Sequence, residues 1–437
     1  MTEHFSQFNF RPIMTDVIHK LEFKKPTAIQ EQVIPAVLEG TSVIGQSQTG
    51  SGKTHAYLLP LLNRLDPEKR EVQLVITAPT RELATQIYDE VRTIIDYAGK
   101  KGTWFAKLLV GGMDKQKMME KLKEPPHIVV GTPGRMLDLV KEQSLSIYIA
   151  SAFVIDEADL MLELGFIQDV DQLLVRAKQD IQLLAFSATI PQQLEHFYRK
   201  YLENPLHVKV DDALSPETLE HRFIPLKNRD PAEVIAGISE TIQPYLAIIF
   251  TNGKENADAL ASSLQQKGLD TGLIHGGLAP RERKRVLKEI QNLRYQYIVA
   301  TDLASRGVDI KGVSHVINAQ LPKETDFYVH RAGRTARAGM EGTVISLYDD
   351  NDIRLMEKLK QKGLPVAFWD VKNGEWKPSK FRNDRKKDDT TDQDADNMAW
   401  KKVKKYKKVK PGYKKKMKKQ QEKAKNQLMK KSNKKRK

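Results

Sequence analysis

The sequence predicts an α/β protein with two tandem domains, each a parallel sheet flanked by helices, plus a basic and disordered C-terminal tail. The first observation is that short apolar runs recur along the 437 residues, each followed at once by small, polar or charged residues. Buried parallel strands appear in a sequence as such continuous apolar runs. The second observation is that helical patterns lie between these runs. Strand alternating with helix is typical of a parallel sheet covered on both faces.

Apolar runs mark the expected strands in both halves of the chain. In the first half they lie in "SVIGQSQTGSGKT", "LVITAPTREL", "HIVVGTPGR", "FVIDEAD" and "LLAFSAT", and in the second half in "AIIFTNGK", "GLIHGG", "YIVATDLASRG" and "HVINAQLP". After the second run, Leu83, Ile87, Val91 and Ile94 share one face of a helix. Ligands of parallel sheets bind beyond the carboxyl ends of the strands, so the polar segments after the runs form the candidate site.

The series of apolar runs is interrupted once, and this interruption divides the chain into two domains. We expect a first domain over residues 1–210, a linker over 211–218, which is rich in Asp, Ser and Pro, and a second domain over 219–370. Residues 371–437 are expected to form an acidic spacer and then a lysine-rich tail. Two domains of comparable size, each with an edge of polar loops, are able to close on a shared ligand.

Composition excludes several classes of protein. The chain has no apolar run of about 18 residues, so we expect no membrane span. The N-terminal segment "MTEHFSQFNF" lacks the basic and apolar regions of a secretion signal. The absence of cysteine removes disulfides and thiolate metal sites, which fits a reducing compartment. The expected location is therefore cytoplasmic.

The net charge of +16 belongs to the end of the chain. Residues 401–437 contain 20 Lys or Arg and one acidic residue, a net charge of +19, so the first 400 residues carry −3, the difference between +16 and +19. A segment with this composition has little to bury and repels itself, which predicts disorder. Either it only keeps the protein soluble, or it is an arm that binds nucleic-acid phosphates. Tyr406 and Tyr413, which can stack on bases, favour the arm.

A glycine-rich loop, "SQTGSGKT" at 47–54, lies between an expected strand and an expected helix. In that setting Gly50 and Gly52 allow backbone N–H groups to surround phosphate oxygens, and the helix N-terminus adds a favourable potential. Lys53 supplies a positive charge for the β- and γ-phosphates, and the Thr54 hydroxyl is placed for Mg²⁺. A pattern of this kind also arises by chance. The nucleotide-binding residues expected here are Gln48, Thr49, Gly50, Ser51, Gly52, Lys53 and Thr54.

Three carboxylates follow another expected strand, in "FVIDEAD". Such crowding raises the pKa of each acid unless something offsets the repulsion. A Mg²⁺ held between Thr54, nucleotide phosphates and Asp156 would do so, with Asp156 binding largely through water. Glu157 would then orient or deprotonate the attacking water. The simpler interpretation is a solvated acidic turn, but a phosphate loop in the same half of the chain weighs against it.

Taken in order, "SGKT", "PTRELA", "TPGR", "DEAD", "SAT" and "HRAGRTAR" resemble the motifs of the DEAD-box ATP-dependent RNA helicases. The resemblance runs from about Phe5 to Tyr348, and the full set of motifs is very specific. Within the family, the phosphate-loop segment and the lysine-rich end resemble the CshB-type cold-shock helicases of Gram-positive bacteria. The resemblance implies two RecA-like domains, ATP and Mg²⁺ as cofactors, and RNA as the partner.

The resemblance assigns further residues around the nucleotide. In "FKKPTAIQ", Gln30 is implied to contact the adenine edge, with Phe23 and the upstream Phe5 adding aromatic surface. Ser187 and Thr189 of "SAT" are implied to couple the ATP state to domain closure through hydrogen bonds to the DEAD loop. Without the resemblance, those hydroxyls would be interpreted as a helix cap.

The second half is implied to complete the ATP site. Arg334 and Arg337 of "HRAGRTAR" would reach the γ-phosphate across the cleft and stabilise the transition-state charge. In "TDLASRGVD", Asp309 would approach the ribose and Gly307 the phosphates. Arginine-rich loops are often only solvated, so the assignment of "HRAGRTAR" depends on the resemblance. Because neither half has a complete site, hydrolysis should require both to close.

The remaining polar loops resemble contacts to the RNA backbone. Small residues and helix N-termini allow close approach to phosphates and 2′-hydroxyl groups, which predicts binding with little sequence preference. Gly253 and Pro280 depart from the residues usual in the family, whereas Lys254 and Arg283 are kept. The expected RNA contacts are Thr80, Arg81, Gly111, Gly112, Thr132, Gly134, Arg135, Arg283 and Thr301.

Three functions remain to be distinguished from the sequence. The first is an RNA-stimulated ATPase that unwinds short RNA duplexes and remodels RNA or ribonucleoprotein, a role that the resemblance connects with cold adaptation, ribosome assembly or RNA turnover. Ribosomal particles and RNA-decay enzymes are the protein partners that it suggests. The second is an ATP-gated RNA clamp or annealing chaperone in which the tail does most of the binding. The third, a DNA translocase, fits the phosphate loop but not the adenine and "DEAD" motifs.

Overall fold

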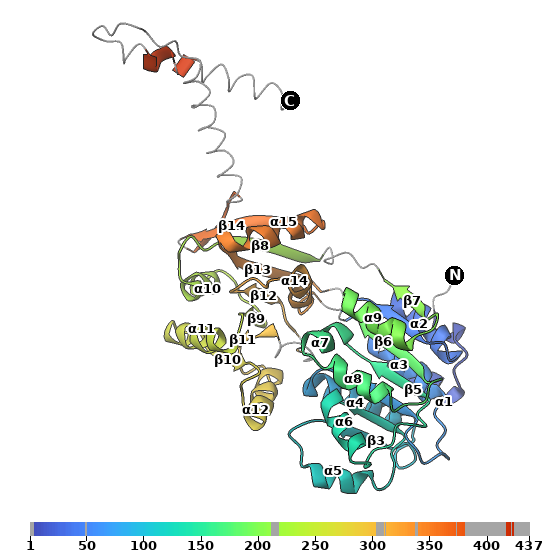
Figure 1. The fold of residues 1–437 in the computed structure, drawn as a ribbon. Coiled ribbons are helices and arrows are strands. Elements are labelled where there is room, and N and C mark those ends of the chain that lie inside the picture. The colour runs from blue at the N-terminus through green and yellow to red at the C-terminus, as the bar shows by residue number, and fades with distance from the viewer. Residues whose placement is uncertain are drawn as a thin grey trace.

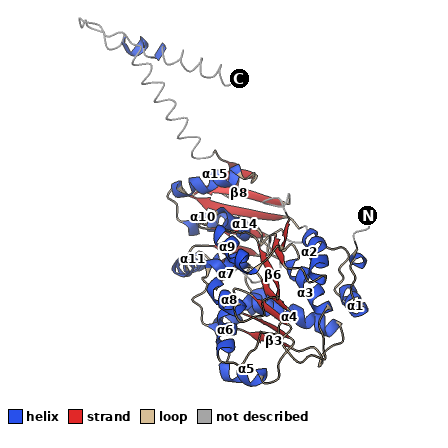
Figure 2. Ribbon diagram, turned by 45° about the vertical axis from the view of Figure 1, so that its right-hand side comes forward, coloured by secondary structure: helices blue, strands red, loops and turns tan. Residues whose placement is uncertain are grey.

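The computed structural model describes residues 4–48, 50–210, 218–302, 310, 312–336, 340–372, 374–380, 417–420 and 422–423. It contains one seven-stranded and one eight-stranded sheet, joined by the segment before Leu219 (Figure 1). Helices cover both faces of the sheets (Figure 2). The predicted fold class, two parallel-sheet domains flanked by helices, is confirmed for the described residues.

The first sheet has the strand order β3-β4-β2-β5-β6-β1-β7, and every pairing in it is parallel. Its strands are β1 (Val43–Gln46), β2 (Leu74–Thr77), β3 (Ala106–Leu109), β4 (Ile128–Gly131), β5 (Ala152–Ile155), β6 (Gln182–Ser187) and β7 (Leu206–Lys209). The strands β2, β4, β5 and β6 are buried at every position, which explains their unbroken apolar sequences.

Successive residues of the first sheet enter two different cores. On β5, Val154 belongs to the core under α1–α4, whereas Phe153 and Ile155 belong to the core under α5–α9. The helices of this domain are η1 (Phe5–Gln7), α1 (Pro12–Lys20), α2 (Ala28–Leu38), α3 (Lys53–Asn63), α4 (Arg81–Tyr97), α5 (Lys115–Leu122), α6 (Pro133–Lys141), α7 (Ala158–Glu163), α8 (Ile167–Leu174) and α9 (Gln192–Tyr201).

The second sheet has the strand order β10-β11-β9-β12-β13-β8-β14-β15, parallel except for the last pair. Its strands are β8 (Leu219–Pro225), β9 (Ala247–Phe250), β10 (Thr271–Ile274), β11 (Tyr297–Ala300), β12 (His315–Asn318), β13 (Gly342–Tyr348), β14 (Val366–Lys372) and β15 (Glu375–Pro378). Its helices are α10 (Pro231–Ser239), α11 (Lys254–Gln266), α12 (Pro280–Gln291), α14 (Thr325–Ala332), η3 (Asp350–Asp352) and α15 (Ile353–Gln361). One core lies under α10 and α11 and the other under α12, α14 and α15.

The second domain extends past residue 370, where the sequence analysis placed its end. Strand β14 continues to Lys372, and β15 adds an antiparallel edge strand within the expected spacer. Asp370 anchors this extension because its carboxylate accepts hydrogen bonds from Lys227 at 2.6 Å and Arg229 at 2.8 Å. A boundary near residue 380 therefore describes the folded part better. Most of the expected lysine-rich tail lies outside the described residues.

The order of the first sheet brings three polar loops together. Strands β5, β6 and β1 are neighbours and run in the same direction. The "DEAD" segment follows β5, "SAT" overlaps the end of β6, and the phosphate loop follows β1. All three therefore meet at one edge of the sheet.

Within the described part of the chain, no helix combines the length and apolar character needed to cross a membrane.

Candidate nucleotide and RNA site

The phosphate loop turns on two glycines. Gly50 has a φ of 87° and Gly52 a φ of 95°, a backbone conformation that favours glycine over other residues. The Ser47 and Ser51 hydroxyls lie 2.7 Å apart and close the loop. Helix α3 begins at Lys53, so the loop ends at a helix N-terminus, as an anion-binding loop requires. Thr49 lies outside the described residues.

Lys53 points back into the loop that precedes it. Its Nζ atom donates hydrogen bonds to the carbonyl oxygens of Ser47 at 2.6 Å and Gln48 at 2.8 Å. Burial lowers the pKa of Lys53, and the positive charge of Arg334 from the second domain lowers it further, whereas the nearby carboxylates raise it. The acids and the cation around Lys53 therefore come from both domains.

Tyr57 connects the two residues that were predicted to hold Mg²⁺. Its hydroxyl donates to the Asp156 carboxylate at 2.9 Å and also has a hydrogen bond with the Thr54 side chain. Tyr57 is completely buried. The sequence analysis missed it, although its position one helical turn after Thr54 was a signal. The two oxygen donors are thus close together, which suits a hard cation such as Mg²⁺.

Asp156 and Glu157 differ in environment although they are adjacent in sequence. Asp156 is buried, and burial together with the charge of Glu157 raises its pKa to about 6. Glu157 is half-buried and has a φ of 51°, an unusual conformation for a non-glycine residue. Its backbone N–H donates to the Asp156 carboxylate at 3.0 Å. The two neighbouring acids therefore differ in burial and in backbone conformation.

Asp159 holds the "SAT" segment against the DEAD loop. Its carboxylate accepts hydrogen bonds from the backbone N–H of Thr189 at 3.0 Å and from the Thr189 hydroxyl at 3.1 Å. The Ser187 hydroxyl accepts the backbone N–H of Asp159 at 3.1 Å. These are hydrogen bonds of the kind that the family resemblance implied. The same Asp159 carboxylate lies 3.7 Å from His330 of the second domain.

Gln30 contacts the phosphate loop directly. It caps its own helix α2 by accepting the Thr27 backbone N–H at 2.9 Å, and it donates to the Gly52 carbonyl at 3.1 Å. A Cβ at position 52 would lie 2.7 Å from the Gln30 amide nitrogen, so glycine is needed there for contact as well as for conformation. Phe23 stacks on Phe5 with ring centroids 6.0 Å apart. Gln30 therefore lies against the phosphate loop, and Phe5 and Phe23 form an aromatic pair in the same domain.

Arg331 of the second domain is a structural residue. It is buried, and its guanidinium donates to the Asp302 carboxylate, to Asn252 and Asn318, and to the Gln320 carbonyl. Five hydrogen bonds therefore tie α14 to the neighbouring loops. Arg334 lies one turn further on and faces the first domain. The predicted site residues Arg337, Gly307 and Asp309 lie outside the described residues.

Arg283 has a protein partner in this structure. Its Nε atom lies 2.8 Å from the Glu82 carboxylate of the first domain, and the two side chains are only 15% and 18% exposed. The sequence analysis expected Arg283 to contact RNA. The ion pair joins the two domains in this structure, a contact that the order of motifs in one sequence could not reveal, and the RNA contact stays a prediction.

The other expected RNA contacts of the first domain gather around the N-termini of α4 and α6, whereas Thr301 follows β11 of the second domain. Arg81 is exposed and crosses Gly111 so closely that a Cβ at 111 would lie 2.9 Å from its Nη2 atom. Arg135 donates to the Met113 carbonyl at 3.2 Å. Thr80 and Thr301, by contrast, are buried. Gly112, Thr132 and Gly134 lie in the same loops, Gly112 with a φ of 82° and the other two half-buried at the start of α6.

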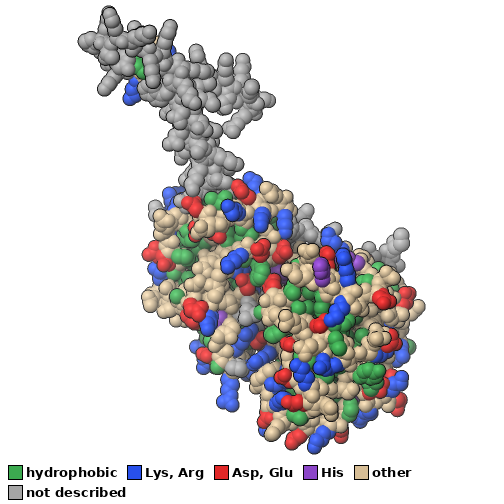
Figure 3. Space-filling model, viewed as in Figure 1, with side chains coloured by type: hydrophobic (Ala, Val, Ile, Leu, Met, Phe, Trp, Pro, Cys, Tyr) green, Lys and Arg blue, Asp and Glu red, His purple; other side chains and the backbone are tan. Residues whose placement is uncertain are grey.

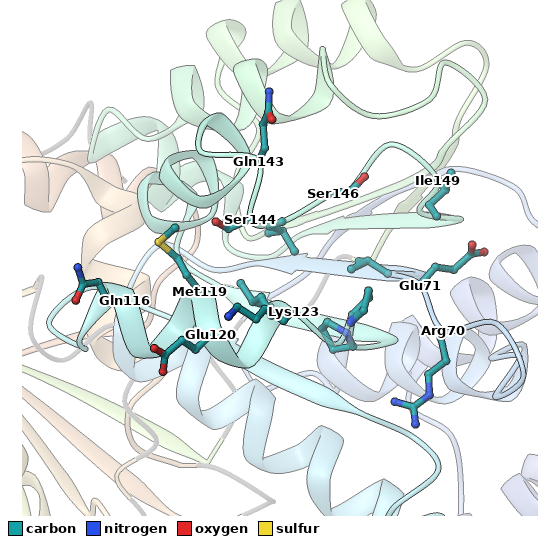
Figure 4. Close-up of a pocket in the computed structure, with 15 residues that line it drawn as sticks. Arg70, Glu71, Gln116, Met119, Glu120, Lys123, Gln143, Ser144, Ser146 and Ile149 are labelled. Atoms are coloured by element: carbon teal, nitrogen blue, oxygen red, sulfur yellow. The ribbon is translucent and has the colours of Figure 1, made fainter.

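A hollow of about 900 Å³ lies elsewhere in the first domain (Figure 4). Its lining comes from the segments before β2, β4 and β5, and includes Val72, Pro126 and Ile149. The hollow is therefore at the amino ends of the strands, opposite the polar loops. None of the predicted site residues lines it.

On the visible face of the folded part, Lys and Arg are interspersed with Asp and Glu (Figure 3).

The fold and the site together define a class of protein. Two parallel-sheet domains, a phosphate loop beside clustered carboxylates in one, and an arginine of the other, Arg334, near the lysine of that loop are the features of a RecA-like nucleotide-hydrolysing motor. A model of the DEAD/DEAH box helicases matches residues 27–197, and a model of the conserved C-terminal domain of helicases matches residues 230–339. The chain belongs to the family of DEAD-box ATP-dependent RNA helicases.

Individual relatives agree with this assignment. The chain is 52% identical to the DEAD-box ATP-dependent RNA helicase CshB of Bacillus subtilis (strain 168), over 99% of each chain. It is 47% identical to CshB of Listeria monocytogenes, over 94% of this chain and 95% of the relative. Among solved structures, Dbp5 of S. cerevisiae bound to RNA and ADP BeF3 matches with a TM-score of 0.78 and 28% identity, covering 85% of this chain and 96% of that one.

Proposed function

We propose that this chain hydrolyses ATP at a site shared by its two domains, and that closure of the domains on ATP and RNA locally separates short RNA duplexes. The observation that carries the proposal is that side chains of the second domain reach the phosphate loop and the DEAD segment of the first. Arg334 perturbs the pKa of Lys53, and His330 lies 3.7 Å from Asp159. Each domain alone lacks part of the charge needed to stabilise a transferring phosphoryl group.

In this proposal the first domain binds the nucleotide. The phosphate loop and Lys53 hold the phosphates, while Gln30 and Phe23 contact the adenine. Thr54 and Asp156, brought together by Tyr57, are the residues that would hold Mg²⁺. When bound, the ion neutralises charge on the phosphates. Lys53 is already aimed into the loop by its hydrogen bonds to the loop carbonyls, so little reorganisation is needed on binding.

Glu157 is the proposed base. Glu157 is half-buried whereas Asp156 is buried, and its backbone has left-handed dihedral angles. A carboxylate in that position orients or deprotonates the water that attacks the γ-phosphate. Arg334 and Arg337 then stabilise the charge that develops on the phosphoryl oxygens. Hydrolysis therefore depends on a base from one domain and cations from the other.

RNA enters the proposal through the loops at the N-termini of α4 and α6. Arg81, Arg135 and the glycines beside them bind phosphates and ribose hydroxyl groups, which gives little sequence preference. The Arg283–Glu82 ion pair joins the second domain to the first turn of α4, next to Arg81. Closure would therefore position an RNA contact as well as the ATP site. Asp159 accepts a hydrogen bond from Thr189 of "SAT" and lies near His330 of the second domain. We therefore propose that Asp159 couples the ATP state to domain closure.

Strand separation tests the proposal directly. A short labelled RNA duplex is mixed with ATP and either the full chain or a variant that lacks residues 381–437. We expect both proteins to release the labelled strand. Annealing or retention of the strands by the full chain, with no ATP-dependent release, would favour an ATP-gated clamp or annealing chaperone. Equal stimulation of ATP hydrolysis by DNA and RNA would favour a DNA translocase.

The lysine-rich tail is proposed to bind RNA phosphates without sequence preference. Its net charge of +19 over residues 401–437 predicts a strong salt dependence through release of counterions. We expect removal of the tail to flatten the plot of log Kd against log salt concentration. An unchanged slope would leave the tail with a solubilising role only.

We also propose that the RNA and protein partners belong to cold adaptation, ribosome assembly or RNA turnover. The support is the likeness to CshB helicases over almost the whole chain. Crosslinking of the protein to RNA in cells, followed by sequencing of the bound RNA, checks it. Enrichment of ribosomal RNA or of decay intermediates is expected, and an unselective sample of transcripts would argue against all three roles.

A further inference from the structure

His55 follows the phosphate loop directly and contacts an aromatic side chain from another part of the first domain. The ring centroids of His55 and Phe23 are 4.8 Å apart and their planes meet at 88°, an edge-to-face arrangement. Phe23 in turn stacks on Phe5. The His55 side chain is 16% exposed, so the contact is largely shielded from water. Neither composition nor motif order assigned any role to His55.

The opposite side of His55 faces helix α4. Its Nε2 atom is buried and lies 3.4 Å from a carboxylate oxygen of Glu90. His55 itself lies in the first turn of α3, next to Thr54. The His55 side chain, which belongs to α3, therefore contacts two other parts of the domain. These are the aromatic pair of Phe5 and Phe23, through Phe23, and helix α4, through Glu90.

We propose that His55 is a positioning residue of the ATP site, which holds the ring of Phe23 in place beside the first turn of α3. The inference rests on the proposed function, in which Phe23 contacts the adenine. Because α3 starts at the phosphate loop, a ring fixed to α3 stays at a constant distance from the phosphate-binding groups. Base and phosphates then meet a surface ordered before ATP arrives, which lowers the cost of ordering side chains on binding.

ATP affinity and base preference distinguish positioning from simple packing. We expect His55→Ala to raise the KM for ATP about fivefold while kcat in saturating RNA stays within about twofold, because an edge-to-face aromatic pair of ordinary strength is lost. The preference for ATP over UTP should fall by a similar factor, because a displaced Phe23 no longer favours adenine. If His55 only contributes packing, His55→Ala should lower the fraction of folded protein and leave the preference for ATP over UTP unchanged.

A double-mutant cycle with Phe23→Ala shows whether His55 acts through Phe23. If it does, His55→Ala raises the KM of the Phe23→Ala protein no further, whereas independent residues give multiplied effects. Multiplied effects would overturn the inference. If Phe23→Ala itself leaves the KM unchanged, the adenine role in the proposed function fails. If Phe23→Ala raises the KM and His55→Ala does not, the proposal for His55 alone fails.

Two further variants keep the test decisive. His55→Phe retains an aromatic ring but cannot approach Glu90 with a polar atom, so we expect it to keep most of the ATP preference even if His55→Ala folds poorly. Loss of that preference to the level of an alanine at 55 would contradict a role through ring contact. His207→Ala, at an exposed position on β7, is the matched control and should behave as the unmodified protein. Thermal unfolding of each variant reports its folded fraction.

Discussion

The two domains share a fold but contribute opposite charges to the site. The first domain brings the phosphate loop together with Asp156, Glu157 and Asp159, and the hydrogen bonds that organise these acids come from that domain itself. The second domain brings cations. The two described arginines of "HRAGRTAR" have different surroundings. Arg331 donates five hydrogen bonds within its own domain, whereas Arg334 faces the first domain. The comparison supports the proposal that nucleotide binding is local to the first domain, whereas hydrolysis needs both domains.

Among the changes to the acidic residues of the first domain, removal of the proposed base should reduce the rate of ATP hydrolysis most. We expect Glu157→Gln to reduce RNA-stimulated ATP hydrolysis by about a thousandfold, because a general base contributes between a hundredfold and ten-thousandfold to a rate. ATP and RNA binding should be retained because the amide has the shape of the carboxylate. Glu124→Gln, at an exposed position in the same domain, is the control. Undiminished turnover would remove Glu157 from the role of base.

One buried group in each domain, His221 and Asp156, should respond to pH in opposite directions. Burial lowers the pKa of His221 in the second domain to about 4, so neutral His221 stabilises the fold above pH 6.5, and this contribution is lost as the pH falls toward 4. Asp156 has a raised pKa of about 6, so its contribution is present below the unfolded value and is lost as the pH rises through 6. Acid therefore weakens the contribution of His221 and strengthens that of Asp156, while Asp352 of the second domain, whose pKa burial also raises to about 6, responds as Asp156 does.

Calorimetric unfolding of the nucleotide-free protein checks the pH prediction. Between pH 7.5 and pH 5, His221 should cost about 2 kcal/mol of stability in the second domain. His221→Gln should flatten this acid slope while it preserves an acceptor for the Tyr328 hydroxyl, which lies 2.8 Å from His221 Nδ1. The exposed His207→Gln is a suitable control. A variant at 221 that keeps the original slope would show that His221 does not titrate as described.

Charge reversal sharpens the comparison at the contact between the domains. We expect Arg283→Glu or Glu82→Arg alone to reduce RNA-stimulated hydrolysis about tenfold, because each places like charges at a largely shielded contact. The double variant should recover most of the rate, since the opposite charges again face each other. Arg285→Glu, on the exposed side of the same helix, should have little effect. Failure of the double variant to recover would return Arg283 to the role of RNA contact.

Much of the fold could be predicted because buried parallel strands have a strong sequence signal. The runs before the phosphate loop, before "DEAD" and around "SAT" each became strands, β1, β5 and β6. The edge strand β15 could not be predicted, because a short strand with alternating charges has no such signal. What holds that part of the chain is the long-range pairing of Asp370 with Lys227 and Arg229.

The site was predictable where neighbouring residues in the sequence act together, and less so elsewhere. The loop around Lys53 and the acids after β5 follow from local order. Tyr57 was not predicted, because the residues beside it on α3 are apolar and give no sign of its polar contacts. Arg283 has its partner about 200 positions away, in the other domain. Partners chosen by tertiary structure leave no local pattern in a single sequence.

The central claim is that one ATP molecule is hydrolysed by groups from both domains. Single-turnover hydrolysis by Arg334→Ala in the full chain, with saturating RNA, tests it most directly, and the exposed Arg285→Ala serves as the control. The account predicts that ATP affinity stays within a few-fold of the unmodified protein while the hydrolysis step slows by about a thousandfold. Hydrolysis at the unmodified rate by Arg334→Ala would contradict a shared site.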